Sequence, residues 1–127
     1  MKKILFLAGA AALLATPAFA DLASELSTAQ THAGMASTQT DIAMVHKHLQ
    51  HAINCLVGPN GKGFDAAAGN PCGKAGNGAI PDSTDAAQKA KLTSIATSAE
   101  AGVGNSDLAA SQKAAKETAD AIAGASK

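Results

Sequence analysis

Three histidines lie close together in the middle of the chain and have the clearest capacity for chemistry. They are His46, His48 and His51, and Cys55 follows four residues later. The whole chain has only four histidines and two cysteines. Imidazole nitrogen binds zinc, copper, nickel and iron, and thiolate sulfur binds zinc and reduced copper. The cluster therefore predicts a transition-metal site, with copper or zinc as the first candidates and nickel or iron as further ones.

The spacing of these residues indicates which of them can share an ion. In a helix, a rotation of about 100° per residue places Met44, His48, His51 and Cys55 in one narrow stripe. Residues three or four positions apart on a helix are neighbours, so His48 and His51 can bind one ion together, and so can His51 and Cys55. Met44 is a weaker candidate, because methionine on a helix usually only fills space.

The other histidines are harder to assign. His46 falls on a second stripe with Leu49 and Ile53, which favours a hydrogen-bonded core histidine over a ligand. His32 and Asp41 are candidate ligands whose position the spacing leaves open. The cluster matches neither H-E-x-x-H nor Cys-x-x-Cys, so exposed histidines on an amphipathic helix are the alternative interpretation.

The two cysteines allow two interpretations. A single pair in a small exported domain favours a disulfide between Cys55 and Cys72. In the chain-entropy model, a disulfide that closes a loop of this size would contribute up to roughly 3 kcal/mol of stability. The alternative is a Cys2His2 zinc site made by His48, His51, Cys55 and Cys72.

Hydrophobic periodicity and turn residues divide the chain into helices and one long loop. The loop, residues 58–81, holds seven glycines and three prolines, and Cys72 lies within it. Residues 33–36 are expected to form a turn, and Thr38 with Asp41 resembles a capping box. The helices are expected at about 22–32, 38–57, 84–101 and 106–123. We therefore predict an all-α fold: a three- to four-helix bundle with a Gly/Pro-rich loop pinned by a disulfide.

The N-terminus has the pattern of a secretion signal. Lys2 and Lys3 precede an apolar run that ends before a small-x-small site at Ala18–Ala20. We expect cleavage after Ala20, no membrane anchor afterwards, and one domain over residues 21–127 in the periplasm or outside the cell. That domain has few large apolar side chains, so it should need a disulfide, a metal or a partner such as a second copy of itself.

Composition argues against several functions. The expected mature chain has eight lysines, no arginine and ten acidic residues, hence a formal charge of −2, and the sequence has no tryptophan or tyrosine. Nucleic-acid binding is disfavoured, because it needs a basic face and stacking aromatics. The chain has no Cys-x-x-Cys-His motif for covalent c-type haem, and no arrangement of nucleophile and base that would predict an enzyme.

One segment resembles other proteins. The pattern H-x-H-x2-H-x3-C from His46 to Cys55 is followed by Asn-Pro-Cys ending at Cys72 and by the run 76–82. Over about residues 32–82 the chain resembles a group of small exported bacterial proteins of unknown function. The resemblance implies that this segment is the functional centre and implies no activity. The overall pattern is also similar to small periplasmic helical metal-binding proteins, at the level of fold alone.

Three functions follow as hypotheses. The first is a non-catalytic transition-metal-binding protein that stores, buffers or delivers the ion through the histidine stripe. The second is a structural or protein-interaction module whose disulfide-pinned loop docks a periplasmic partner. The third, and weakest, is an accessory protein of haem or electron transfer.

Overall fold

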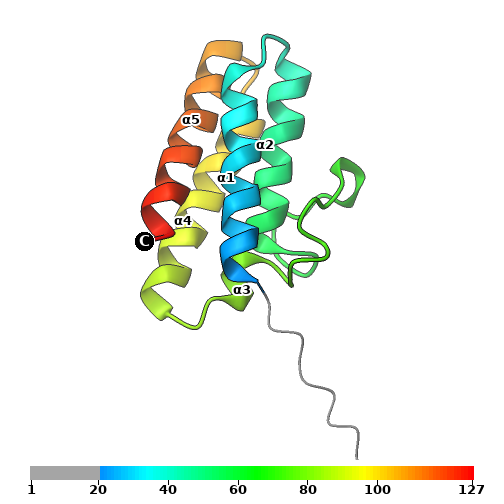
Figure 1. Cartoon of the computed structure of the whole chain (residues 1–127). Helices are drawn as coiled ribbons and strands as arrows, with labels where there is room; N and C mark the ends of the chain where they lie inside the picture. The colour runs from blue at the N-terminus through cyan, green and yellow to red at the C-terminus, as the bar shows by residue number, and fades with distance from the viewer. Residues whose placement is uncertain (1–20) are drawn as a thin grey trace, which may run out of the picture.

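The computed structural model describes residues 21–127, and every regular element within that range is helical (Figure 1). Four long helices lie side by side as a bundle, and the loop after the second long helix projects from one flank. The elements are α1 (Leu22–Thr38), α2 (Ile42–Val57), a 3-10 turn (Ala66–Ala68), α3 (Ala79–Asp82), α4 (Ala86–Val103) and α5 (Leu108–Ala125). The predicted all-α class is confirmed, whereas the predicted signal peptide, residues 1–20, lies outside the described part of the chain.

Each long helix begins directly after an aspartate. The carboxylates of Asp21, Asp41, Asp85 and Asp107 each accept a hydrogen bond from a backbone N–H of the first turn. Such a cap satisfies an otherwise unpaired amide and places negative charge at the positive end of the helix dipole. The last three long helices were predicted to start at about 38, 84 and 106, two to four residues too early, and the capping box expected from Thr38 is replaced by a cap from Asp41.

The first helix is longer than predicted. Residues 33–36, expected to form a turn, continue α1 to Thr38. Ala33 and Ala36 are fully buried in the core. One glycine inside a helix costs only about 1 kcal/mol, and the packing of α1 offsets this cost at Gly34. The extension matters because it places His32 inside a regular helix that packs against α2.

The core is built around α2. The largest fully buried side chains include Val45, Leu49, Ile53 and Leu56, which all lie on this helix. The neighbouring helices α1, α4 and α5 contribute mainly alanine to the core, and all three pack against α2. Small side chains allow close approach: a Cβ at Gly102 of α4 would lie only 2.8 Å from a methyl carbon of Leu49.

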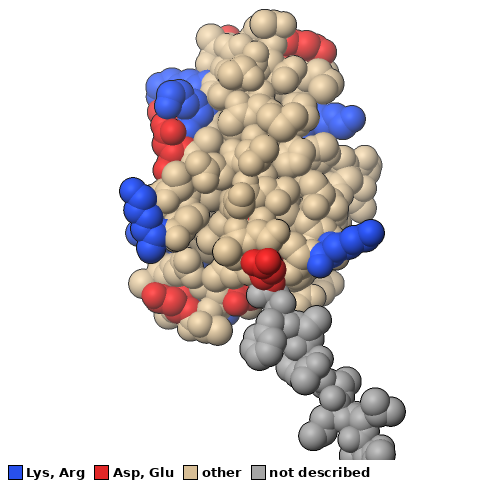
Figure 2. All heavy atoms as spheres, in the orientation of Figure 1, with Lys and Arg blue, Asp and Glu red and all other residues tan. Residues whose placement is uncertain are grey.

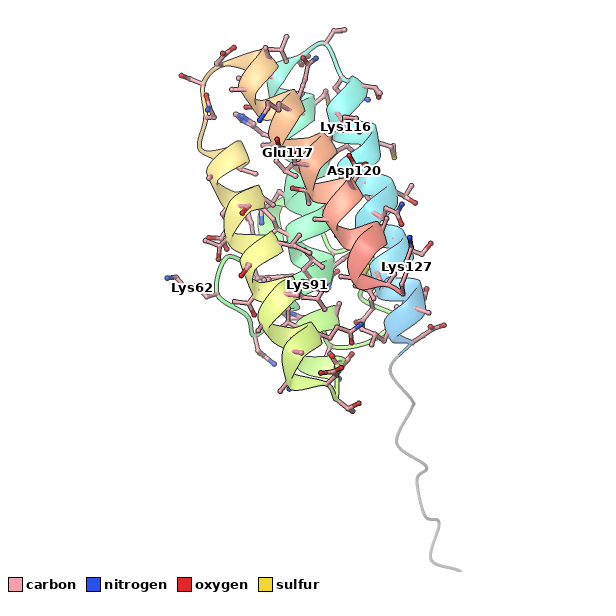
Figure 3. All side chains as sticks on the ribbon, turned by 90° about the vertical axis from the view of Figure 1, so that its left-hand side faces the viewer. Lys62, Lys91, Lys116, Glu117, Asp120 and Lys127 are labelled. Atoms are coloured by element: carbon pink, nitrogen blue, oxygen red, sulfur yellow. A yellow bond between two sulfur atoms is a disulfide. The ribbon has the colours of Figure 1, made fainter. Side chains whose placement is uncertain are left out.

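With the exception of Glu25, the charged side chains of residues 21–127 lie on the outside of the bundle. On the face shown in Figure 2, most of the surface is neither acidic nor basic. The outer face of α5 carries two ion pairs, Lys113–Glu117 at 2.6 Å and Lys116–Asp120 at 2.7 Å. Figure 3 shows Lys116, Glu117 and Asp120 on this helix. Exposed pairs of this kind contribute little to stability. Within residues 21–127 no helix combines the length and the apolar character that crossing a membrane requires.

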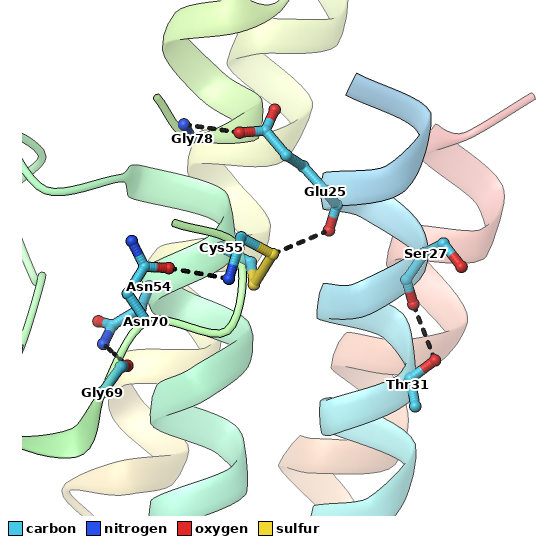
Figure 4. The surroundings of a disulfide bond; sticks show 9 residues. Glu25, Ser27, Thr31, Asn54, Cys55, Gly69, Asn70 and Gly78 are labelled. Carbon is cyan, nitrogen blue, oxygen red and sulfur yellow. Dashed lines mark hydrogen bonds between the residues drawn. A yellow bond between two sulfur atoms is a disulfide. The ribbon is translucent and has the colours of Figure 1, made fainter. Parts of the chain in front are cut away.

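The long loop is tied to the bundle by a covalent bond. Cys55 near the end of α2 forms a disulfide with Cys72 in the loop, as predicted. Figure 4 shows that this disulfide lies beside Glu25 of α1, with Sγ of Cys72 3.8 Å from the Glu25 carbonyl oxygen. The disulfide therefore joins the last turn of α2 to the loop and lies against the first turns of α1.

Glu25 is a buried carboxyl group at the same place. Its Oε1 accepts a hydrogen bond from the backbone N–H of Gly78 at 2.8 Å (Figure 4). Its Oε2 is buried and has no hydrogen-bond partner among residues 21–127. Burial raises the pKa of Glu25 to about 7, and the nearby carboxylates of Asp82 and Asp21 act in the same direction, whereas the Gly78 hydrogen bond opposes them. The loop thus covers a carboxyl group whose protonated, neutral form is favoured by burial.

This burial predicts a pH-dependent stability. Since the pKa of Glu25 is about 7 in the folded protein and near 4.5 in the unfolded chain, the folded state binds the proton more tightly. The free energy of unfolding should therefore fall as pH rises through this interval, by up to about 3 kcal/mol. Glu25→Gln should remove this loss and be more stable than wild type above pH 7. Denaturant unfolding of both proteins from pH 4 to 8.5 measures the difference, and a pH-independent difference would contradict the assignment.

Candidate metal centre

The packing of α1 against α2 brings three histidines together. His32 of α1 lies beside His48 and His51 of α2, and one ring nitrogen from each lies within 4.8 Å of the others. Nδ1 of His32 and Nδ1 of His48 are 3.4 Å apart. All three side chains are half-buried. The pairing of His48 with His51 follows from their helical spacing, and the position of His32 follows from the antiparallel pairing of the two helices.

The three imidazole rings form a compact group. The ring centroids of His32 and His51 are 4.9 Å apart with the rings nearly perpendicular. Those of His32 and His48 are 5.6 Å apart with the rings nearly parallel, and those of His48 and His51 are 5.8 Å apart. Around a tetrahedral Zn²⁺, with Zn–N bonds of about 2.0–2.1 Å, the ligand nitrogens lie about 3.3 Å from each other. The Nδ1 atoms of His32 and His48 already have this separation, and a ring nitrogen of His51 lies within 4.8 Å of a ring nitrogen of each.

One hydrogen bond decides which nitrogen of His51 is free. Nε2 of His51 lies 2.6 Å from the carbonyl oxygen of Ala68. Because a carbonyl can only accept, Nε2 must carry the hydrogen and donate it, which leaves a lone pair on Nδ1. That Nδ1 is buried and has no hydrogen-bond partner in the described part of the chain. Metal-binding histidines usually have this arrangement, in which one ring N–H is held by a carbonyl and the other nitrogen faces the ion.

The electrostatics of the group favour neutral rings. Burial lowers the pKa of His32, and the neighbouring His51 and His48 lower it further. Burial also lowers the pKa of His48, with additional contributions from His51 and Lys47. A histidine must be deprotonated at one nitrogen to bind a metal. The site therefore keeps His32 and His48 ready to bind an ion at neutral pH.

The other predicted ligands lie elsewhere or are already engaged. Nε2 of His46 lies 2.9 Å from the carbonyl oxygen of Asn105 and 3.3 Å from Oγ of Ser111, so this half-buried histidine links α2 to the start of α5. The carboxylate of Asp41 caps α2 by accepting from the N–H of Ala43. Met44 is half-buried one turn before His48.

The structure overturns the alternative zinc site. Cys55 and Cys72 are bonded to each other, and neither sulfur is available as a thiolate ligand. A Cys2His2 site made by His48, His51 and these two cysteines is therefore wrong for the oxidised protein. The disulfide instead lies one helical turn beyond His51.

Two residues that support the site were missed by the sequence analysis. Helical spacing puts Asn54 on one face with the polar residues Lys47 and Gln50 and so predicts an exposed side chain, yet this side chain is fully buried. Its amide bonds to the backbone of the loop segment that includes Ala68. A buried asparagine can be suspected only when its partners are known, and a backbone carbonyl such as that of Ala68 leaves no signal in the sequence.

Comparison with known proteins does not add a function. No family model, no curated protein and no solved structure matches this chain. The chemistry of the three histidines is therefore the feature of this protein that indicates a function.

The proximity of the rings predicts coupled titration. In a His51→Asn variant, the pKa values of His32 and His48 should rise toward 6.5, because both are lowered by the neighbouring His51. An NMR titration of the ring C–H signals in metal-free protein measures both values. If both pKa values stay as in the wild type, the three rings do not form a group in solution.

Proposed function

We propose that this protein binds one transition-metal ion through His32, His48 and His51, as a non-catalytic protein of storage, buffering or delivery. The observation that carries the proposal is the buried Nδ1 of His51, which has no hydrogen-bond partner among residues 21–127 and is part of one of three clustered imidazoles. Leaving a buried polar atom unpaired costs about 1–3 kcal/mol. An ion held by the three rings would remove this cost.

The donor set favours particular ions. Three imidazoles suit Zn²⁺ and Cu²⁺, and Cu²⁺ has the highest affinity for such ligands among the divalent first-row metals. Copper and zinc are therefore the first candidates, and nickel and iron follow. Three protein ligands leave a fourth position for water or an incoming group. Since the three side chains are half-exposed, this position favours an ion that can be exchanged, as delivery or buffering requires.

Two further features support this role. The disulfide indicates an oxidising compartment, in agreement with the predicted export of the chain. Among the described residues, no carboxylate joins the histidine group. The proposed ligand set is therefore imidazole alone.

The test is metal-dependent stabilisation of the oxidised protein. Zn²⁺ or Cu²⁺ should bind with a stoichiometry of one per chain, and free ion at a hundredfold excess over Kd should add about 2.7 kcal/mol to the free energy of unfolding. Calorimetric titration, thermal unfolding and metal analysis measure these effects, with a thiol count to show that the disulfide is intact.

Two variants make the test specific. A His32→Ala/His48→Ala/His51→Ala variant should lose both binding and stabilisation. A His46→Ala variant should keep both, because His46 is hydrogen-bonded to Asn105 and lies outside the group. If none of zinc, copper, nickel and iron stabilises the wild type, the metal proposal fails. The interaction module built on the disulfide-pinned loop would then be the better hypothesis.

A further inference from the structure

The amide group of Asn54 holds the loop that lies against His51. Its Nδ2 donates to the carbonyl oxygens of Asp65 at 2.7 Å and Gly69 at 2.8 Å. Its Oδ1 accepts from the backbone N–H of Asp65 at 3.0 Å and from Nε2 of Gln50 at 3.0 Å. An amide has two donor hydrogens and two acceptor lone pairs, so this fully buried group uses its whole capacity.

These bonds hold both ends of a five-residue segment. Asp65 and Gly69 flank the short 3-10 turn Ala66–Ala68, and the carbonyl of Ala68 is the one that accepts from Nε2 of His51. Gly69 has a φ of +94°. A Cβ at this position would lie 3.8 Å from Nε2 of His51. The segment is thus fixed at two points with the His51 acceptor between them.

We infer that Asn54 is a positioning residue of the metal site, an inference that rests on the proposed function. By fixing the segment 65–69, Asn54 holds the Ala68 carbonyl in place, and this carbonyl keeps the hydrogen of His51 on Nε2. Nδ1 then remains an acceptor for the ion. The disulfide at Cys72 does not replace this contact, because it ties the loop three residues after Gly69.

The chemistry of the position explains why an asparagine stands there. Aspartate could accept from the N–H of Asp65 but could not donate to two carbonyls, and it would bury a charge. Alanine would leave the carbonyls of Asp65 and Gly69 without this donor. Outer-shell partners of metal-binding histidines typically contribute a factor of about 10–100 in metal affinity.

The experiment compares the tautomer of His51 and the affinity for Zn²⁺ in wild type and Asn54→Ala. Long-range ¹H–¹⁵N NMR of the metal-free protein above pH 7.5 reports which ring nitrogen of His51 carries the hydrogen. Wild type should show the Nε2–H form. Asn54→Ala should show a mixture of the two forms, and its Kd for Zn²⁺ should rise by about 10–100-fold.

A matched control separates this role from general loosening of the loop. Oδ1 of Asn70 accepts from the N–H of Cys72 at 3.0 Å, outside the segment 65–69. Asn70→Ala should therefore keep the His51 tautomer and the Kd of wild type. A merely structural role for Asn54 would lower stability without moving the tautomer.

Three results would overturn the inference. The first is an Nδ1–H form of His51 in the wild type, which requires no variant. The second is a folded Asn54→Ala protein with the wild-type tautomer and Kd. If Asn54→Ala does not fold, Gly69→Ala replaces it, because alanine is strained at this positive φ and should displace the segment. The third is a wild-type tautomer in Gly69→Ala.

The two readouts distinguish this inference from the proposed function. The tautomer is measured without metal, so it tests the positioning by Asn54 even if no ion binds. Binding of Zn²⁺ with an unchanged tautomer and Kd in Asn54→Ala would leave the metal site standing and remove the role of Asn54. A shifted tautomer in Asn54→Ala, together with a wild type that binds no ion, would confirm that Asn54 positions His51 and would remove the metal site.

Discussion

One face of α2 is fully buried, and the other three long helices pack around it. The side chains of this face are Val45, Leu49, Ile53 and Leu56. The chain has few other large apolar side chains, so this burial supplies much of the hydrophobic stabilisation. The partner helices contribute mainly alanine and therefore approach α2 closely. This close approach is also what allows an imidazole on α1 to reach two imidazoles on α2, so the site depends on the same constraint as the core.

The last turns of α2 combine packing with polar chemistry. His51 provides a ring nitrogen for the group, Asn54 holds the loop, and Cys55 bonds to it covalently. Three attachments within five residues give a glycine-rich loop a defined position, which its composition alone would not provide. The buried Glu25 lies at the other side of the disulfide and accepts a hydrogen bond from Gly78 near the end of the same loop. The loop is thereby attached to both α1 and α2.

Much of this architecture is predictable from local patterns, and the errors have identifiable causes. The all-α class and the Cys55–Cys72 disulfide are confirmed, because they depend on helical periodicity and on the pairing of two cysteines in an oxidising compartment. The turn predicted at 33–36 is wrong, because buried alanines outweigh the preference of Gly34. The exposure predicted for Asn54 is wrong. Helical spacing puts it on a polar face, but a loop from later in the chain covers this face and buries the side chain.

By itself, the sequence determined which side chains α2 brings onto one face, since the rotation per residue of a helix is independent of its surroundings. It therefore placed His48 and His51 together. The tertiary structure alone decided that His32 completes the group, because this depends on the length of α1 and its register against α2. It also decided that Nδ1 of His51 is the free nitrogen, because the hydrogen on Nε2 is held by a carbonyl 17 residues away. Such contacts arise from packing, and no local pattern records them.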